Sequence, residues 1–392
     1  MNEQISKAPG RLVSNLAIVG IILASVVFVL EMTLVPLLLS TMQGDLQLTT
    51  AQLVWVFNSY SFAVAVFVLI GGWGGDILGA RRVFGIGIIV FCLGAAVSAA
   101  SGSFSTLIAG RIIQGVGGGL FSPLVPVLLT RAMPDKPGKI LIIWGSIAGY
   151  FAAFAPLLGG KLVEAAGWHA IFALFAALAG ASLLLSSLLF MPEEKRELTL
   201  KRDVMALCRL PKLWLTFGYV FCTYGCITFF LFDFPLLLGE AHYTAKAIGL
   251  FLAVMWFSFA AFSTVLRNSV DGEKLGLIMF AAPVLIAAGF VVALLTEQAF
   301  ALFLAGVAVG AGFACSNAPS TQLVLRIVPD SLRGIATSFD ITFARMGGVV
   351  VVAALAKVAP SGAVIGVICM ALVAVACVFL LRGEFSQGPD KT

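Results

Sequence analysis

Residues 26–36 read VVFVLEMTLVP and place one carboxyl group, that of Glu31, inside an otherwise apolar run. From Asn15 to Met42 the chain is apolar apart from Glu31 and a few small hydroxyl or amide residues, which is enough helix to cross roughly 30 Å of hydrocarbon. An ionised carboxylate at that depth costs at least about 2.5 kcal/mol, so the group must be neutral, paired or in contact with a wet cavity. Glu31 is therefore a candidate proton carrier; the alternative is a structural acid hydrogen-bonded to a neighbouring helix.

The composition of the whole chain agrees with a membrane protein. Of its 392 residues, 60% are hydrophobic and only 11% are charged, and the mean hydropathy is +1.08. Soluble domains carry about 25% charged residues, so a soluble class is excluded. Apolar runs of 18 or more residues predict an all-α integral membrane protein with twelve spans, at about 15–40, 51–73, 83–101, 105–130, 139–163, 169–191, 213–239, 246–266, 275–296, 299–326, 334–357 and 361–382.

The basic residues predict the orientation of these spans. If the N-terminus is cytoplasmic, nineteen of the 24 Lys and Arg residues fall inside the cell, and only Lys161, Lys246 and Lys357 fall outside. Arg111 and Arg345 lie within spans. This asymmetry predicts cytoplasmic termini and a multi-pass protein of a bacterial inner membrane. It also assigns the net charge of +5 to membrane topology, so no nucleic-acid partner is expected.

The loop after the second span carries the first family motif. Residues 71–82 read GGWGGDILGARR, in which the glycines allow a sharp turn and close helix packing. The segment resembles the signature loop of the major facilitator superfamily, Gly-x-Leu-Ala-Asp-Arg-x-Gly-Arg-Lys. The resemblance implies that the acid and the basic residues latch the cytoplasmic side in the outward-open state. The residues expected to form this gate loop are Gly72, Asp76, Gly79, Arg81 and Arg82.

A second resemblance lies in the fourth span, where residues 111–119 read RIIQGVGGG. This is similar to the family's fourth-helix motif, Arg-x-x-Gln-Gly-x-Gly, whose arginine is tied to proton transfer. An arginine inside a span needs acceptors, and Gln114 lies one turn from Arg111 on the same face. A purely structural arginine that caps carbonyl groups is the alternative.

Two further motifs favour the exporting branch of the family. Pro156, Gly159 and Gly160 match the Gly-Pro-x-x-Gly-Gly antiporter motif, although its first glycine is an alanine here. A kinked helix with paired glycines can pack closely and seal against leaks. Residues 30–36, LEMTLVP, resemble the Leu-Asp-x-Thr…Pro signature of multidrug exporters, with Glu31 in place of Asp.

The second half of the chain repeats the first. Pro235 is followed by Leu-Leu-Leu and then, nine residues on, by Thr-Ala, which parallels the text after Pro36. Two pseudo-symmetric six-helix bundles are the architecture of transporters that rock about a central site, and a monomer suffices for it. The expected domains are an N-terminal tail (1–14), a first bundle (15–191), a linker (192–212), a second bundle (213–382) and a C-terminal tail (383–392).

Two sets of residues are candidates for the site. The ionisable groups at membrane depth, expected to couple proton movement to transport, are Glu31, Arg111, Asp233, Asp340 and Arg345. Asp340 and Arg345 are about 140° apart on one helix, so they are not expected to pair with each other. Polar residues expected to line a cavity are Asn58, Tyr60, Gln114, Tyr224 and Asn317; for Asn58, an interhelical hydrogen bond is an equal alternative.

Together these features predict a proton-coupled exporter of a small amphiphilic molecule. The family resemblance favours drug-like compounds and the acids favour cations, whereas the two intramembrane arginines leave open an anionic or zwitterionic metabolite such as a siderophore. An importer or facilitator of a small polar metabolite is the alternative. No phosphate-binding Gly-x-x-x-x-Gly-Lys motif is present, so neither ATP nor another cofactor is expected. Cys222 and Cys226 share a helix face without a nearby His or acid, so no metal site is expected. The two histidines, His169 and His242, lie at loop edges, which argues against an enzyme.

Overall fold

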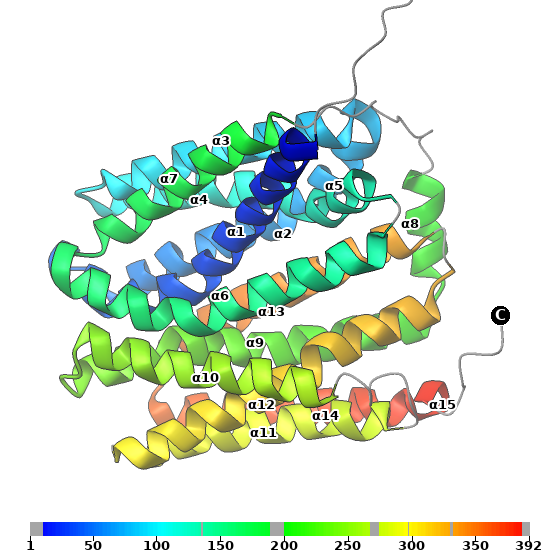
Figure 1. Ribbon diagram of the computed structural model, residues 1–392. Coiled ribbons are helices and arrows are strands. Elements are labelled where there is room, and N and C mark those ends of the chain that lie inside the picture. Colours follow the sequence, from blue (N-terminus) through cyan, green and yellow to red (C-terminus); the bar gives the residue numbers. More distant parts are fainter. Residues whose placement is uncertain are drawn as a thin grey trace, which may run out of the picture.

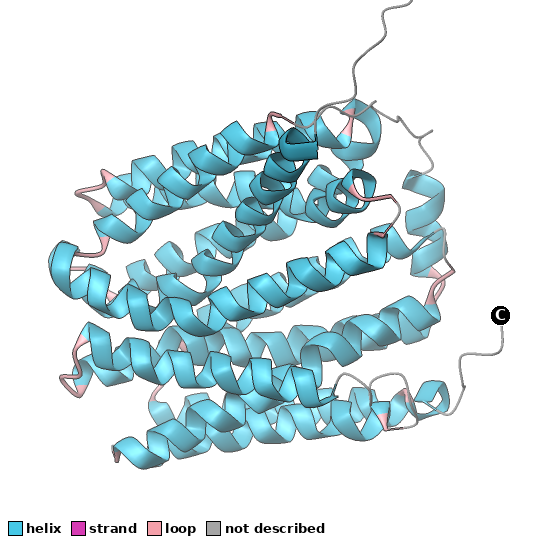
Figure 2. Cartoon of the chain, in the orientation of Figure 1, coloured by secondary structure: helices cyan, strands magenta, loops and turns pink. Residues whose placement is uncertain are grey.

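The computed structural model describes residues 11–134, 136–188, 200–266, 274–296, 298–329 and 332–385. The predicted tails and linker therefore fall partly outside the described residues, at 1–10, 192–199 and 386–392. Every regular element in the described part is helical (Figures 1 and 2). The described residues contain twelve helical spans that are long and apolar enough to cross a membrane, as the sequence predicts.

The first half of the chain provides six crossings. Its elements are α1 (Arg11–Leu46), α2 (Thr50–Leu78), α3 (Ala80–Ala99), α4 (Phe104–Phe121), η1 (Ser122–Leu124), α5 (Val125–Ala132), α6 (Pro137–Ala166) and α7 (His169–Ser186). The fourth crossing consists of α4, η1 and α5 in series. The break between α4 and α5 follows from Pro123 and Pro126, which lack the N–H that would continue the helical hydrogen bonds.

The second half provides the other six. Its elements are the short α8 (Leu200–Cys208), followed by α9 (Pro211–Glu240), α10 (Ala245–Leu266), α11 (Leu275–Leu295), α12 (Ala299–Ile327), α13 (Arg333–Leu355), α14 (Pro360–Leu380) and the four-residue α15 (Arg382–Phe385). Because the number of crossings is even, α1 begins and α14 ends at the same end of the molecule. We call this the terminal end, and the opposite end the far end.

The two halves pack by the same scheme. In the first, α2 and α3 both pack on α4, and α7 packs on α1 and α3; in the second, α10 and α11 pack on α12, and α14 packs on α9 and α11. Figure 1 shows the two groups of helices one above the other. The internal repeat in the sequence therefore corresponds to a repeat in the helix arrangement.

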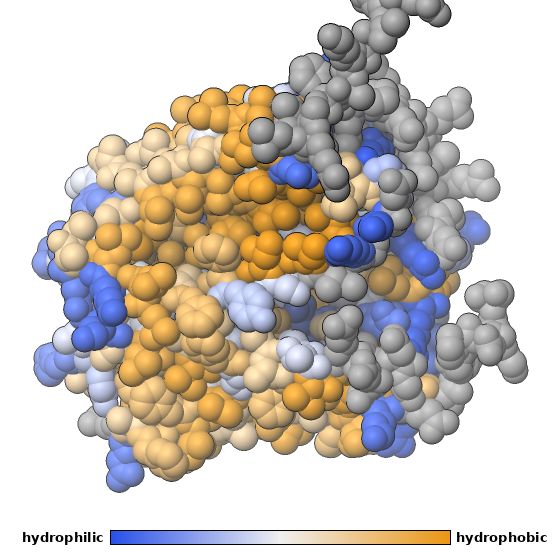
Figure 3. Space-filling model, viewed as in Figure 1, coloured by the Kyte–Doolittle hydropathy of each residue, from blue (hydrophilic) through white to orange (hydrophobic). Residues whose placement is uncertain are grey.

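Glycines allow the close approach of helices within each bundle. A β-carbon built on Gly117 would lie 2.2 Å from the backbone nitrogen of Phe91, and one built on Gly310 would lie 2.1 Å from the carbonyl oxygen of Met255. Such contacts replace the hydrophobic driving force that is missing between helices in lipid. At the surface, hydrophobic side chains cover the middle of the molecule and hydrophilic ones gather toward its two ends (Figure 3).

The bundles are joined mainly by α2 with α13, α6 with α10, and α1 with α9, and α1 also contacts α10. Between α2 and α13, the side-chain amide of Asn58 donates a hydrogen bond to the carbonyl of Val349 at 2.9 Å, and the hydroxyl of Thr342 donates to that of Ala65 at 3.1 Å. Between α1 and α9, a β-carbon on Gly239 would lie 2.8 Å from that of Ser40. This last contact closes the far end of the interface.

Candidate functional site

A buried ion pair joins Glu31 on α1 to Arg111 on α4. The guanidinium Nη1 of Arg111 donates to the carboxylate Oε1 of Glu31, and the two residues are 2% and 1% exposed, respectively. Glu31 lies fifteen residues before the end of α1, about 22 Å from the far end. The energetic problem posed by a carboxylate at this depth is solved by a partner 80 residues away in the sequence.

Arg111 has further partners that hold it in place. Its Nη1 also donates to Gln114 Oε1 at 3.1 Å, and its Nε donates to the carbonyl of Val56 at 3.2 Å. Its guanidinium carbon lies 4.6 Å from the ring centre of Tyr60 and 5.7 Å from that of Phe172. Arg111 would therefore keep neutral acceptors and an aromatic face if Glu31 were to lose its charge.

The pair lies at a small pocket between the two bundles with a cavity volume of about 30 Å³. Three helices of the first bundle and two of the second, α9 and α13, contribute to its wall. The lining residues are Glu31, Met32, Val35, Phe57, Tyr60, Ser61, Arg111, Thr228, Leu231 and Arg345. This is room for one or two water molecules and is well below the size of an occupied ligand pocket, so the two bundles are closely packed here.

Six of these lining residues are absent from the sequence-based set: Met32, Val35, Phe57, Ser61, Thr228 and Leu231. A signal for two of them exists in the sequence. Met32 and Leu231 each stand four residues before a proline inside a helix, Pro36 in α1 and Pro235 in α9. Because proline cannot donate to the carbonyl one turn earlier, each bundle presents a freed carbonyl at this pocket.

Arg345 on α13 lines the same pocket with far fewer partners than Arg111. Its guanidinium carbon lies 5.2 Å from the ring centre of Phe28 on α1. No hydrogen bond or ion pair joins it to any residue that the structure describes. Arg345 does not pair with Asp340, in agreement with their separation around the helix.

The remaining two acids lie elsewhere. Asp233 is seven residues before the end of α9, about 10 Å from the far end, and it is not part of the pocket wall. Asp340 is seven residues after the start of α13, at the terminal end, where its Oδ2 accepts a hydrogen bond from Thr321 at 3.0 Å. Its other oxygen is buried without a partner among the described residues. The five ionisable residues therefore form one cluster of three and two separate positions.

The polar candidates are divided in the same way. Tyr60 lines the pocket, and its buried hydroxyl has no hydrogen-bond partner among the described residues; Gln114 serves as an acceptor for Arg111. Asn58 instead faces α13, which agrees with the interhelical alternative. Within the second bundle, the hydroxyl of Tyr224 donates to Asn317 Oδ1. Neither Tyr224 nor Asn317 lines this pocket.

The predicted gate loop connects α2 to α3 at the terminal end. Gly79 has φ of 96°, a conformation that L side chains rarely adopt, and this explains its identity. A β-carbon on Gly72 would lie 3.6 Å from the hydroxyl of Ser338 on α13, so the loop adjoins the second bundle. Arg81 donates to the carbonyl of Ser187 at 2.9 Å, which ties α3 to α7. Asp76 is exposed, as is Arg82.

The predicted antiporter motif lies where α6 meets its neighbours. A β-carbon on Gly159 would lie 2.4 Å from a methyl carbon of Leu34, and one on Gly160 would lie 2.7 Å from the carbonyl oxygen of Ala245. Pro156, inside α6, lies against α10. Near the same end, the backbone N–H of Lys246 donates to the carboxylate of Glu164 at 2.8 Å. These contacts hold α6 against α10 in the far half of the interface.

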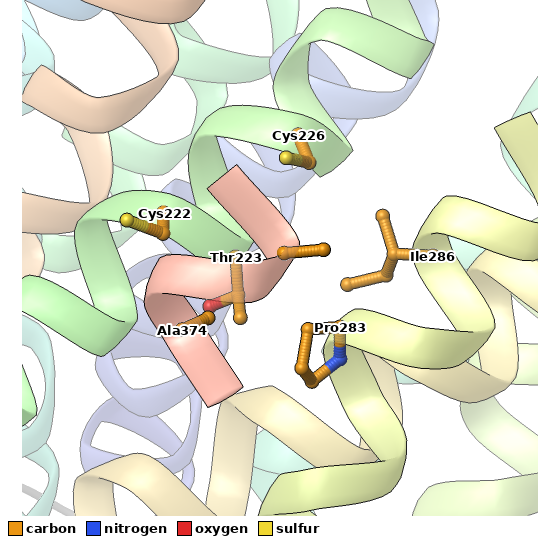
Figure 4. A pocket seen from close by; sticks show the side chains of 7 residues that line it. Cys222, Thr223, Cys226, Pro283, Ile286 and Ala374 are labelled. Atoms are coloured by element: carbon orange, nitrogen blue, oxygen red, sulfur yellow. The ribbon is translucent and has the colours of Figure 1, made fainter. Parts of the chain in front are cut away.

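A second pocket, too small to hold a water molecule, lies within the second bundle between α9, α11 and α14. Figure 4 shows Cys222 and Cys226 on one helix opposite Pro283 and Ile286 on another. The hydroxyl of Thr223, one of the lining residues, donates to the carbonyl of Tyr219. This pocket contains no charged side chain and none of the predicted site residues.

The chain is similar to curated bacterial drug-resistance proteins. It is 29% identical to the tetracenomycin C resistance and export protein of Streptomyces glaucescens over 69% of this chain and 48% of that one. It is 31% identical to a multidrug resistance protein B homolog of Mycobacterium tuberculosis over 50% of this chain and 36% of that one. The chain therefore matches about half or less of the length of these relatives.

The fold and the family are established by two further comparisons. The crystal structure of the nucleoside transporter NupG superposes with a TM-score of 0.77 at 16% identity, covering 95% of this chain and 100% of that one. The family model described as Major Facilitator Superfamily matches residues 21–352. This chain belongs to the major facilitator superfamily, a family of membrane transporters and not of enzymes.

Proposed function

We propose that this transporter is a proton-coupled exporter of small amphiphilic molecules, and that the Glu31–Arg111 pair is its proton switch. The observation that carries the proposal is the position of this pair at a pocket between the two bundles, where both rocking halves contribute to the wall. The names of the relatives, which describe drug resistance and export, support the direction of transport.

The switch works through the charge of Glu31. With its carboxylate ionised, Glu31 and Arg111 are neutral as a unit and hold α1 against α4. When a proton binds to Glu31, this ionic attraction is lost, and Arg111 keeps only Gln114, the carbonyl of Val56 and the ring of Tyr60. The pocket then gains one positive charge. Because α1 also contacts α9, a change in the pair alters the surface on which the second bundle rocks.

We place the terminal end in the cytoplasm of a bacterial inner membrane. The distribution of Lys and Arg supports this orientation. In this orientation the far end faces the outside. The contacts between α6 and α10 near that end support a state closed to the outside. One proton that crosses 100 mV supplies about 2.3 kcal/mol, which is sufficient to concentrate an uncharged molecule roughly 50-fold.

The test is proton movement in liposomes that contain the purified full chain and a pH-sensitive dye. Tetracenomycin C, tetraphenylphosphonium and 2-naphthoate are added in turn against an imposed proton gradient. We expect at least one of them to drive a pH change that Glu31→Gln abolishes. Glu240→Gln removes an exposed carboxylate at the far end of α9 and is the matched control. Undiminished, compound-driven proton flux in Glu31→Gln would refute the switch, and compound uptake without any proton flux would indicate a facilitator.

A further inference from the structure

The charges at the pocket between the bundles do not balance. Its wall contains two guanidinium groups, those of Arg111 and Arg345, and only one carboxylate, that of Glu31. Glu31 is committed to Arg111 by a direct hydrogen bond. Once this pair is counted as neutral, the guanidinium of Arg345 remains as the net charge of the site.

No other carboxylate among the described residues forms an ion pair with Arg345. On its own helix, Asp340 bonds to Thr321 of α12. On α9, Asp233 lies outside the pocket wall, and the groups that reach the wall from this helix are Thr228 and Leu231. The contact that the structure gives to Arg345 is the ring of Phe28. A cation–π contact leaves the five N–H donors of a guanidinium without acceptors, so the group is prepared for an anion.

Neutral hydrogen-bonding groups lie beside this charge. The hydroxyl of Tyr60 is buried and has no partner among the described residues, and Ser61 and Thr228 add two hydroxyl groups to the same wall. Phe57 and Leu231 give the pocket an apolar side. The pocket thus combines a guanidinium without an ion-pair partner, three hydroxyl groups of which that of Tyr60 is unpartnered, and an aromatic surface.

We propose that the cargo of this transporter carries an anionic group, a carboxylate or an acidic enol or phenol, which Arg345 binds while an apolar or aromatic body packs against Phe57 and Leu231. A guanidinium binds a carboxylate through two parallel hydrogen bonds, and this geometry distinguishes an acid from its amide. The inference rests on the proposed function in one respect, that this pocket receives the cargo. An anion also leaves a cell with a negative interior along the membrane potential, which suits an exporter.

Binding to the purified full chain in nanodiscs tests this proposal with three probes of one shape: 2-naphthoate, its neutral amide 2-naphthamide, and the cation 2-naphthylmethylammonium. Tryptophan fluorescence quenching or calorimetry gives the three dissociation constants. We expect naphthoate to bind at least about tenfold more tightly than the other two, because a charge-assisted bidentate pair is worth this much at a partly buried site. Arg345→Gln is expected to remove the preference, and Arg345→Lys to retain part of it.

The matched control is Arg382→Gln. The guanidinium of Arg382 also lies over a phenyl ring, that of Phe379, at 3.9 Å, but it is remote from the pocket wall. This variant should keep the full preference for naphthoate, and thermal unfolding should show that each variant is folded. Equal affinities for acid and amide, tighter binding of the cation, or a preference that survives in Arg345→Gln would each overturn the proposal. Because binding needs no gradient, undiminished proton flux in Glu31→Gln, which would refute the proposed switch, would leave this binding result unaffected.

Discussion

Gly249 of α10 lies directly against Pro156 of α6, so that a β-carbon built on Gly249 would be 2.3 Å from the carbonyl oxygen of Pro156. The two residues belong to different bundles. Their contact, together with that of Gly160 with Ala245, allows the far half of the interface to close. The predicted antiporter motif therefore acts together with a glycine on the opposite bundle, which the sequence motif does not include.

Gly249→Val should hold this part of the interface apart. Overpacking costs about 1–3 kcal/mol, which shifts the ratio of closed to open forms by about 5- to 160-fold. We expect transport to fall accordingly while each bundle keeps its own core. Hydrogen exchange of the first turn of α10 measures the opening. Gly145→Ala, on the same helix as Pro156 but with no atom within 4 Å of the added carbon, is the control and should transport normally.

The Glu31–Arg111 pair should give a strongly non-additive double-mutant cycle. Arg111→Gln leaves the buried carboxylate without its partner, and breaking such a pair costs about 3–5 kcal/mol. We expect each single variant to lower the thermal unfolding temperature in detergent. The double variant Glu31→Gln/Arg111→Gln should recover much of the loss, because no unpaired charge remains. Additive losses in the double variant would show that the two groups do not depend on each other.

The twelve spans could be predicted from the sequence because each of them is a predominantly apolar run of 18 or more residues. Only the break between α4 and α5 needed the structure to show it. The site could be predicted only in part. Glu31 and Arg111 were both candidates, but nothing in the sequence pairs two residues that lie 80 positions apart. The neighbour that spacing does predict, Gln114 one turn from Arg111, is present.

Helix rotation explains the candidates that lie outside the pocket. On α2, Phe57, Tyr60 and Ser61 share one face at i, i+3 and i+4 and line the pocket, whereas Asn58 is turned by about 100° from Phe57 and reaches α13 instead. On α9, Asp233 stands two residues after Leu231, a rotation of about 200°. The polarity of a residue indicates that it avoids lipid, but not which neighbour it faces.

Glu164 caps the start of α10 from the opposite bundle. Its carboxylate accepts from the N–H of Lys246, in the first turn of α10, where the helix dipole favours a negative charge. Glu164→Gln should weaken this closure and speed amide exchange in that turn. Glu240→Gln, a charge change at the same end of the molecule without this contact, should leave the exchange unchanged. Exchange that does not respond to Glu164→Gln would exclude a role for the cap.

The separate positions of the acids predict unequal effects on proton coupling. Asp233 lies outside the pocket wall, so Asp233→Asn should keep the rate of proton-coupled transport within about twofold of that of the parent protein. A substitution away from the site usually changes the free energy by less than about 0.5 kcal/mol, which corresponds to a change of this size. Glu31→Gln removes the titrating group of the pair and should uncouple transport from the proton gradient. Both variants are compared in the liposome measurement of proton flux, at equal protein density. Each amide preserves the size of the side chain and removes only its capacity to titrate. A larger loss in Asp233→Asn than in Glu31→Gln would therefore assign the proton switch to α9 and not to α1.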